Sequence, residues 1–223
     1  TADEWLKCGA PGSMVKELTK LGSSERKCRL FAVACCRVVW ARIPDERARA
    51  AVLVAERAAD GEATPVELNA AMMEATAARQ QWGRELSRNE QDAERWSFSG
   101  TASCVDATHS EPTRCLDAWH DAAETAFQAG AKWHASLGEH CDLLRCVFGN
   151  PFRPVTFDRA WRTENTVGVA AKMYYERDFL GMPILADALQ DAECDNDDIL
   201  SHCRGHGPHV RGCWVVDLVL GKE

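Results

Sequence analysis

Hydrophobic residues recur at three- and four-residue spacing along most of the chain, and this spacing predicts α-helices. The clearest helix follows Ser23 and Ser24, either of which can cap its N-terminus, and it is expected to run to about Trp40. Its buried side is predicted to consist of Leu30, Phe31, Ala34, Cys35, Val38 and Val39. This first amphipathic stretch predicts a helix in contact with a core.

Two further helices have local start signals. Asp45 is expected to open a helix that runs to about Ala59, because an acidic residue suits the positive end of the helix, and Gly61 follows its end. Residues 64–67 read Thr-Pro-Val-Glu, which is a capping box with proline at the first helical position. They predict a helix that continues to about Arg88.

The methionines of this third helix, Met72 and Met73, are expected to fill gaps in the core. Residues 89–110 lose the periodicity and are rich in serine, threonine and glycine, so a loop is predicted there. A long helical region is expected from about 112 to 148, with a break near Gly138. Residues 1–148 are therefore predicted to form an antiparallel helical bundle.

Residues 149–154 contain glycine and two prolines, which stop helix formation, and a smaller unit is predicted at 149–223. No strand-like alternation is seen, so the expected fold class is all-α, a bundle followed by a small helical unit. A final apolar segment runs from His209 to Leu220, and because its last part, Cys213 to Leu220, is rich in β-branched residues, helix and strand both stay open there. The other helices expected in this unit span about 164–178, 182–191 and 196–203.

Composition narrows the function classes. The chain has 26 basic and 34 acidic residues, and its net charge of −8 argues against nucleic-acid binding. No stretch approaches the ~20 apolar residues of a membrane helix. The first six residues are polar and acidic and do not resemble a signal peptide. We therefore expect a cytoplasmic protein whose 11 cysteines are thiols or metal ligands.

Cysteine and histidine residues are concentrated near the C-terminus. Cys194, Cys203, His209 and Cys213 provide the four ligands that a tetrahedral zinc site requires. One expectation conflicts with this set. A helix over 196–203 would separate Cys194 from Cys203 by about 10–13 Å, whereas two thiolates on one zinc ion lie within roughly 4 Å.

An alternative set avoids the conflict. His209 and Cys213 would share one face of a helix, Cys203 or His202 would come from the end of the preceding helix, and His206 lies between them. Cys194 would then be a buried thiol. A third interpretation, that these residues are ordinary buried thiols and histidines without an ion, also stays open.

Another candidate metal site is the Asp117-x-x-His120 pair in the long helical region. Di-iron bundles use two Glu-x-x-His pairs, and no second copy occurs, so a solvated charged face is the simpler interpretation. The chain contains no Gly-x-Ser-x-Gly elbow, no phosphate-binding loop and no His-Glu-x-x-His helix.

Two blocks of sequence are similar to an uncharacterised bacterial protein family. The first comprises residues 26–40 (RKCRLFAVACCRVVW) and 55–61 (AERAADG) and resembles the beginning of its members. The second runs from 148–155 (FGNPFRPV) through 185–189 to 209–217 (HVRGCWVVD) and resembles their end. The resemblance assigns no catalytic residue, and it implies an accessory protein that binds a partner.

The function expected from the sequence is that of a non-enzymatic interaction or adaptor protein, whose partner is another protein and whose C-terminal unit contains structural zinc. Exposed tryptophans would mark the partner surface, and the candidates are Trp5, Trp96, Trp119 and Trp133. One alternative is a metal-dependent enzyme that uses Cys203, His209 and Cys213, or the His120 face. The other is RNA binding through a finger-like C-terminus.

Overall fold

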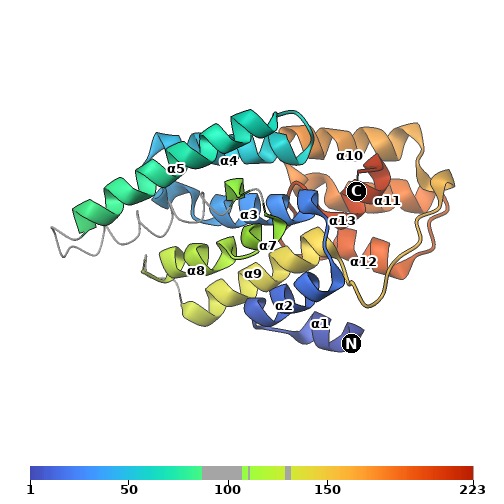
Figure 1. Cartoon of the computed structure of the whole chain (residues 1–223). Helices are drawn as coiled ribbons and strands as arrows, with labels where there is room; N and C mark the ends of the chain where they lie inside the picture. Colours follow the sequence, from blue (N-terminus) through green and yellow to red (C-terminus); the bar gives the residue numbers. More distant parts are fainter. Residues whose placement is uncertain (87–106, 110, 129–131, 223) are drawn as a thin grey trace. The chain divides into compact units, whose positions relative to one another are not determined.

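The computed structural model describes residues 1–86, 107–109, 111–128 and 132–222. Over these residues the secondary structure is helical and contains no strand, as the sequence predicts (Figure 1). No helix in these ranges is both long and apolar enough to cross a membrane. The chain divides into two compact units. Residues 8–141 form the N-terminal unit, and residues 1–7 and 142–223 form the C-terminal unit.

The N-terminal unit is built around α3, which packs against α4, α7 and α8, while α4 also packs along α5 (Figure 1). Residues 28–36 of α3 are all buried, which explains why the chain carries small and apolar side chains on almost every side of this helix. The elements of the unit are α2 (Pro11–Leu21), α3 (Glu25–Val38), η1 (Trp40–Arg42), α4 (Glu46–Ala59), α5 (Pro65–Leu86), α7 (Pro112–Cys115), α8 (Ala118–Gln128) and the first part of α9 (Trp133–Phe148).

The predicted helix starts are confirmed by their hydrogen bonds. The Ser24 side chain accepts a hydrogen bond from the backbone N–H of the third helical residue of α3, and the Asp45 side chain accepts one from the backbone N–H of the second helical residue of α4. At α5 the capping box is complete. The Thr64 N–H donates to the Glu67 carboxylate at 2.7 Å, and the Glu67 N–H donates to the Thr64 hydroxyl at 3.2 Å.

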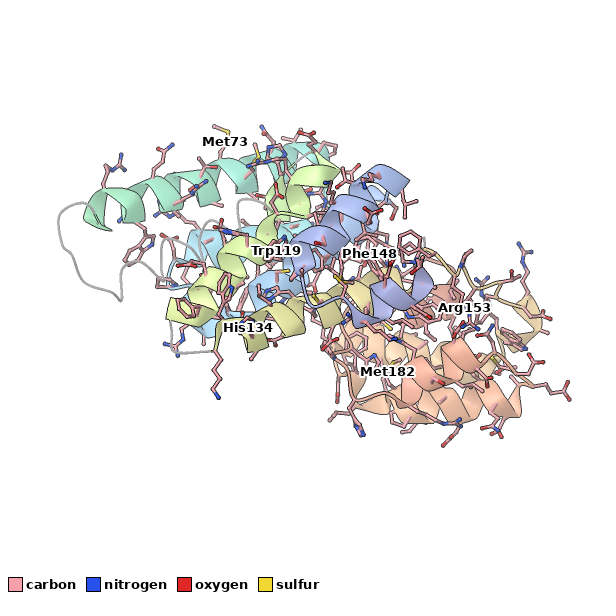
Figure 2. All side chains as sticks on the ribbon, turned by 90° about the horizontal axis from the view of Figure 1, so that it is seen from below. Met73, Trp119, His134, Phe148, Arg153 and Met182 are labelled. Atoms are coloured by element: carbon pink, nitrogen blue, oxygen red, sulfur yellow. The ribbon has the colours of Figure 1, made fainter. Side chains whose placement is uncertain are left out.

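Two expectations for this unit are wrong. The long helical region does not break at Gly138, which lies inside α9, where an added Cβ would meet no atom within 4 Å. A helical glycine costs roughly 1 kcal/mol relative to alanine, and the buried residues on both sides of Gly138 offset this cost. Met73 is 63% exposed on the outer side of α5 and fills no gap in the core (Figure 2). The loop predicted at 89–110 falls almost wholly outside the described residues.

The C-terminal unit has a core of its own. In it α11 packs against α10 and α12, and α13 packs against the same two helices. The ambiguous segment at the C-terminus is helical from Trp214 to Leu220, and Gly221 ends this helix, α13, in the left-handed conformation (φ 68°). The elements are α1 (Ala2–Lys7), the end of α9, η2 (Arg159–Trp161), α10 (Glu164–Glu176), η3 (Phe179–Gly181), α11 (Met182–Asp191), α12 (Asp197–Arg204) and α13 (Trp214–Leu220).

The two units divide between Cys141 and Asp142, seven residues before the boundary expected at 148/149. Proline and glycine end the helix after Phe148, but the last turns of α9 already belong to the C-terminal core, where the Cys146 side chain is buried. Residues 1–7 join the same unit because the Trp5 indole N–H donates to the Gly149 carbonyl at 2.8 Å.

The expectation that tryptophans mark an exposed surface is wrong for Trp5, which is only 3% exposed. Trp119 and Trp133 are half-buried. Trp96 lies outside the described residues. Among the candidate tryptophans that the structure describes, none therefore marks an exposed partner surface.

Candidate metal centre

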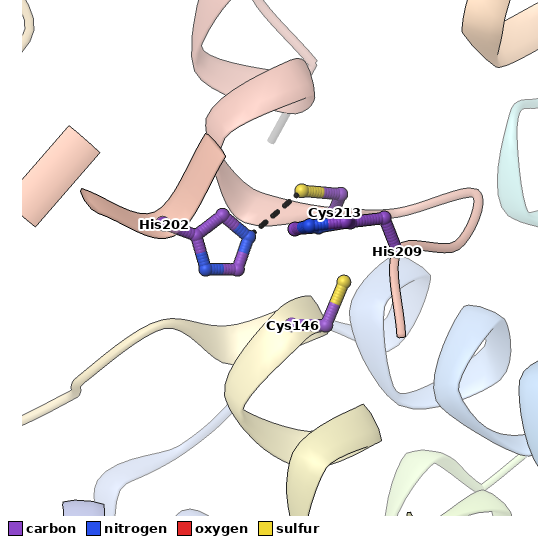
Figure 3. Close-up of side chains that lie close together, drawn as sticks. All are labelled: Cys146, His202, His209 and Cys213. Carbon is purple, nitrogen blue, oxygen red and sulfur yellow. Dashed lines mark hydrogen bonds between the residues drawn. The ribbon is translucent and has the colours of Figure 1, made fainter. Parts of the chain in front are cut away.

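Four side chains of the C-terminal unit converge on one point (Figure 3). Cys146, His202, His209 and Cys213 each place one sulfur or nitrogen atom so that the four atoms all lie within 4.8 Å of one another. Cys146 comes from the end of α9, His202 from the last turn of α12, and Cys213 from the residue before α13. His209 lies in the connection between α12 and α13.

The local sequence explains how α12 presents His202. Asn196 caps the helix by accepting hydrogen bonds from the N–H groups of Asp198 and Ile199, both at 3.1 Å. Gly205 ends the helix, and the chain then runs without regular structure to a turn at Val210, whose carbonyl accepts from the Cys213 N–H at 2.9 Å.

Gly149 lies at the end of α9, which carries Cys146, and packs against Trp214 at the start of α13, next to Cys213. Its φ of +64° ends α9 in the left-handed region, and an added Cβ would lie 3.2 Å from the Trp214 ring. Trp214 follows Cys213 directly, and its ring lies 5.2 Å from the His202 ring. The glycine thus allows the end of α9, which carries Cys146, to lie close to the start of α13.

The histidine side chains of the cluster contact one another and the Cys213 sulfur. The His202 Nε2 lies 3.2 Å from the Cys213 sulfur (Figure 3), and the His202 and His209 rings meet edge to face at 4.9 Å. Both ring nitrogens of His209 are buried, and neither makes a hydrogen bond of normal geometry, although the Cys213 sulfur lies close enough to interact with the ring. Because buried polar atoms nearly always have a partner, an ion bound between the four side chains is a physical explanation for the two buried ring nitrogens of His209.

The electrostatics of the cluster favour one thiolate. Burial, together with the hydrogen bond to Cys213, raises the pKa of the Cys146 thiol well above its usual value. Burial opposes ionisation of Cys213 as well, but the Cys146 thiol and His202 outweigh it and hold the pKa of Cys213 well below its usual value. Although burial disfavours its charged form, the neighbouring Cys213 sulfur raises the pKa of His209. Metal ligation requires a deprotonated thiol, and the lowered pKa of Cys213 favours this form.

The structure brings together only part of the set expected from the sequence. His209 and Cys213 are in the cluster, and of the two alternates His202 is included, whereas His206 is exposed outside it. Cys194 and Cys203 are buried thiols outside the cluster, and burial raises the pKa of each.

Helix geometry explains why the cluster contains one of the neighbours His202 and Cys203 and not both. Consecutive residues of an α-helix point about 100° apart, so these neighbours cannot both face the same ion. The helix expected to join His209 to Cys213 is not formed, and a turn brings the two residues together instead.

Cys146 was not predicted. It lies far from the other ligands in the sequence, ahead of the expected unit boundary, and nothing in its local sequence distinguishes it from other buried cysteines. The signal in the sequence was the local density of cysteine and histidine, and a ligand from a distant helix cannot contribute to it.

The other candidate sites do not assemble. His120 is 64% exposed and lies 3.6 Å from Asp121, while Asp117 pairs with Arg114 at 3.7 Å. These are surface contacts, and they do not converge on an ion. In the N-terminal unit a cavity of about 200 Å³ is lined by Arg29. The Arg29 guanidinium already donates to the carbonyls of Ala107 and His109, so the positive charge of Arg29 has a structural role.

Comparisons of the chain with protein-family models, with curated proteins and with solved structures gave no significant match. The class that the fold and the site define is therefore an all-helical protein with a candidate centre of two cysteines and two histidines.

Proposed function

We propose that Cys146, His202, His209 and Cys213 hold a structural zinc ion, and that the protein is a non-enzymatic interaction protein whose C-terminal unit depends on this ion. The observation that carries the proposal is the convergence of two sulfur and two nitrogen atoms within 4.8 Å. Zinc prefers such thiolate and imidazole ligands in tetrahedral geometry. Calcium and magnesium require oxygen ligands, and the cluster contains no carboxylate.

The number of ligands supports a structural role over a catalytic one. Catalytic zinc sites have three protein ligands and keep a fourth position open for water or substrate, whereas structural sites are closed by four. The four side chains of this cluster would fill the shell, and both cysteines are almost completely buried. A metal-dependent enzyme is therefore the weaker alternative.

The ion would link segments that are distant along the chain. It would connect the end of α9 to α12 and to the start of α13, and these segments carry a core that includes Cys146, Ile199 and Val215. Structural zinc contributes its binding free energy to folding, so a unit of this small size would gain stability from it. The proposal predicts that the C-terminal unit loosens when the metal is removed.

The test is elemental mass spectrometry on untagged protein that was purified without chelator. We expect about one zinc ion per chain, as one closed four-ligand site requires, and loss of it in Cys146→Ala and in Cys213→Ala. The matched control is Cys203→Ala, since Cys203 is an equally buried thiol of the same unit but lies outside the cluster. This control should keep the zinc.

Two results would contradict the proposal. Absence of metal from every preparation would leave the cluster as ordinary packing. Loss of zinc in Cys203→Ala and Cys194→Ala, with retention in Cys146→Ala, would instead favour the set Cys194, Cys203, His209 and Cys213. A thermal melt with and without chelator accompanies the metal assay. A structural ion predicts a lower melting temperature without metal, and a melting temperature that does not respond would argue against it.

A further inference from the structure

One face of α11 and the preceding η3 exposes apolar side chains. Leu180 is 87% exposed and Ile184 is 61% exposed, and Pro183 between them is also exposed. Leu180 lies in the turn η3 directly before α11, and Pro183 and Ile184 lie in the first turn of α11, so the three residues are close together at the start of this helix. Isolated apolar residues are common on protein surfaces, whereas neighbouring ones mark contact sites. The other side of α11 is buried in the core through Met182, Leu185, Ala186 and Leu189.

Acidic residues continue the same face. Asp187 and Asp191 are exposed and follow Ile184 at helical spacing, about one and two turns further along α11. The segment around them is acidic, because residues 177–204 contain seven acidic residues and two arginines, Arg177 and Arg204. Outside this segment the chain has 27 acidic and 24 basic residues. The segment therefore carries five of the eight net negative charges of the chain.

The order of side chains along the face indicates its partner. From Leu180 to Asp191 the face is about 16 Å long, which is the length of three helical turns, and it changes from apolar to acidic along the way. An amphipathic helix with apolar residues and lysine or arginine complements both halves. An anionic surface such as nucleic acid or an acidic membrane would be repelled by the aspartates.

One ion pair stands in the acidic half. The Arg204 guanidinium lies 3.2 Å from the Asp187 carboxylate, with side chains 45% and 74% exposed. Exposed pairs of this kind contribute little to stability, so a cation from a partner can replace Arg204. Arg204 also donates to the Gln190 side chain at 2.7 Å, so it would keep a hydrogen-bond partner when a cation of the bound helix pairs with Asp187.

We infer that the face formed by Leu180, Pro183, Ile184, Asp187 and Asp191 binds a basic amphipathic helix of a partner protein. The inference names the partner class of the interaction protein proposed above, and it rests on that proposal. Apolar contacts supply affinity, and the aspartates select for a basic segment and against an acidic one.

Binding is measured by fluorescence anisotropy with the full chain and a labelled 18-residue helical peptide that carries leucine on one face and lysine on the others. A second peptide has glutamate in place of lysine. The basic peptide should bind and the acidic one should not. Leu180→Ser/Ile184→Ser should weaken binding about tenfold, since interface anchors dominate affinity, and Asp187→Asn/Asp191→Asn should weaken it and flatten its salt dependence.

The controls carry equal changes on another surface. Val66→Ser/Met73→Ser removes two exposed apolar side chains of α5, which are 78% and 63% exposed, and Glu62→Gln/Glu74→Gln removes two exposed charges. These variants should bind the basic peptide as the unaltered chain does. All substituted positions are exposed, so helix content by circular dichroism should not change.

Three results would overturn the inference. They are failure of the basic peptide to bind, equal weakening by the control variants, and equal binding of the acidic peptide. Sedimentation supplies a fourth, because a dimer that dissociates in Leu180→Ser/Ile184→Ser would make the face an interface between copies of this chain. Zinc content is measured on every variant, so a defect in the metal centre is distinguished from a defect in this face.

Discussion

The substitution Gly149→Ala tests how the metal centre is assembled. Gly149 has a φ of +64°, and an added Cβ would lie 3.2 Å from two atoms of the Trp214 ring. Holding a non-glycine residue in the left-handed region costs about 1–2 kcal/mol. Moving a packed ring to make room costs about another 1–3 kcal/mol. The free energy of unfolding should therefore fall by about 2–5 kcal/mol in total.

The matched control is Gly221→Ala, which lies in the same unit at the end of α13. Its φ is +68°, so the backbone cost is the same, but its added Cβ would lie 3.4 Å from the Arg162 guanidinium, which is an ordinary van der Waals contact. The control should lose about 1–2 kcal/mol. The difference between the two variants isolates the contact with Trp214.

Urea denaturation of both variants, followed by circular dichroism, measures these free energies. Zinc affinity is measured in parallel, because Trp214 adjoins Cys213 and lies beside His202. We expect a reduced affinity in Gly149→Ala and an unchanged affinity in Gly221→Ala. Equal losses of stability in the two variants, or a metal affinity that does not respond, would refute the proposed role of Gly149.

Three further predictions concern single hydrogen-bonded positions. Trp5→Phe removes the indole donor to the buried Gly149 carbonyl, and it should lower the free energy of unfolding by about 1–3 kcal/mol in urea melts. Thr64→Ala removes the capping box of α5 and should cost about 0.5–2 kcal/mol, with a smaller effect contradicting the role of the cap. The Arg47 guanidinium, through its hydrogen bonds, holds the pKa of Asp45 below its usual value. Ionised Asp45 therefore stabilises the fold above a pH of about 4, and this contribution is lost as the pH falls through the lowered pKa. The stability difference between the unaltered chain and Asp45→Asn should thus be present at neutral pH and vanish in acid, as urea midpoints at several pH values would show.

Helix boundaries could be predicted where the signal lies within one turn. Ser24, Asp45 and Thr64 cap the helices that follow them, and each acts on a backbone N–H two or three residues ahead. Gly138 shows the limit of such signals. A glycine within a periodic hydrophobic pattern predicts a break in the helix, but tertiary packing of α9 keeps Gly138 helical.

Only part of the candidate metal centre could be predicted, because the signal in the sequence was again local. Cysteine and histidine near the C-terminus indicated its location, and His209 and Cys213 are in the cluster. The choice between His202 and Cys203 depends on the direction in which α12 turns its side chains relative to the other ligands. The sequence contains that information only through the packing of the whole unit.

The sequence by itself determined the all-helical class, most helix starts and the region of the candidate centre, because these follow from side chains a few residues apart. Only the tertiary structure decided that Cys146 completes the cluster and that Trp5 lies in the C-terminal unit. Both are contacts between residues far apart in the chain. Such contacts depend on the burial of apolar surface and the pairing of buried polar groups across many helices at once, and local patterns do not encode them.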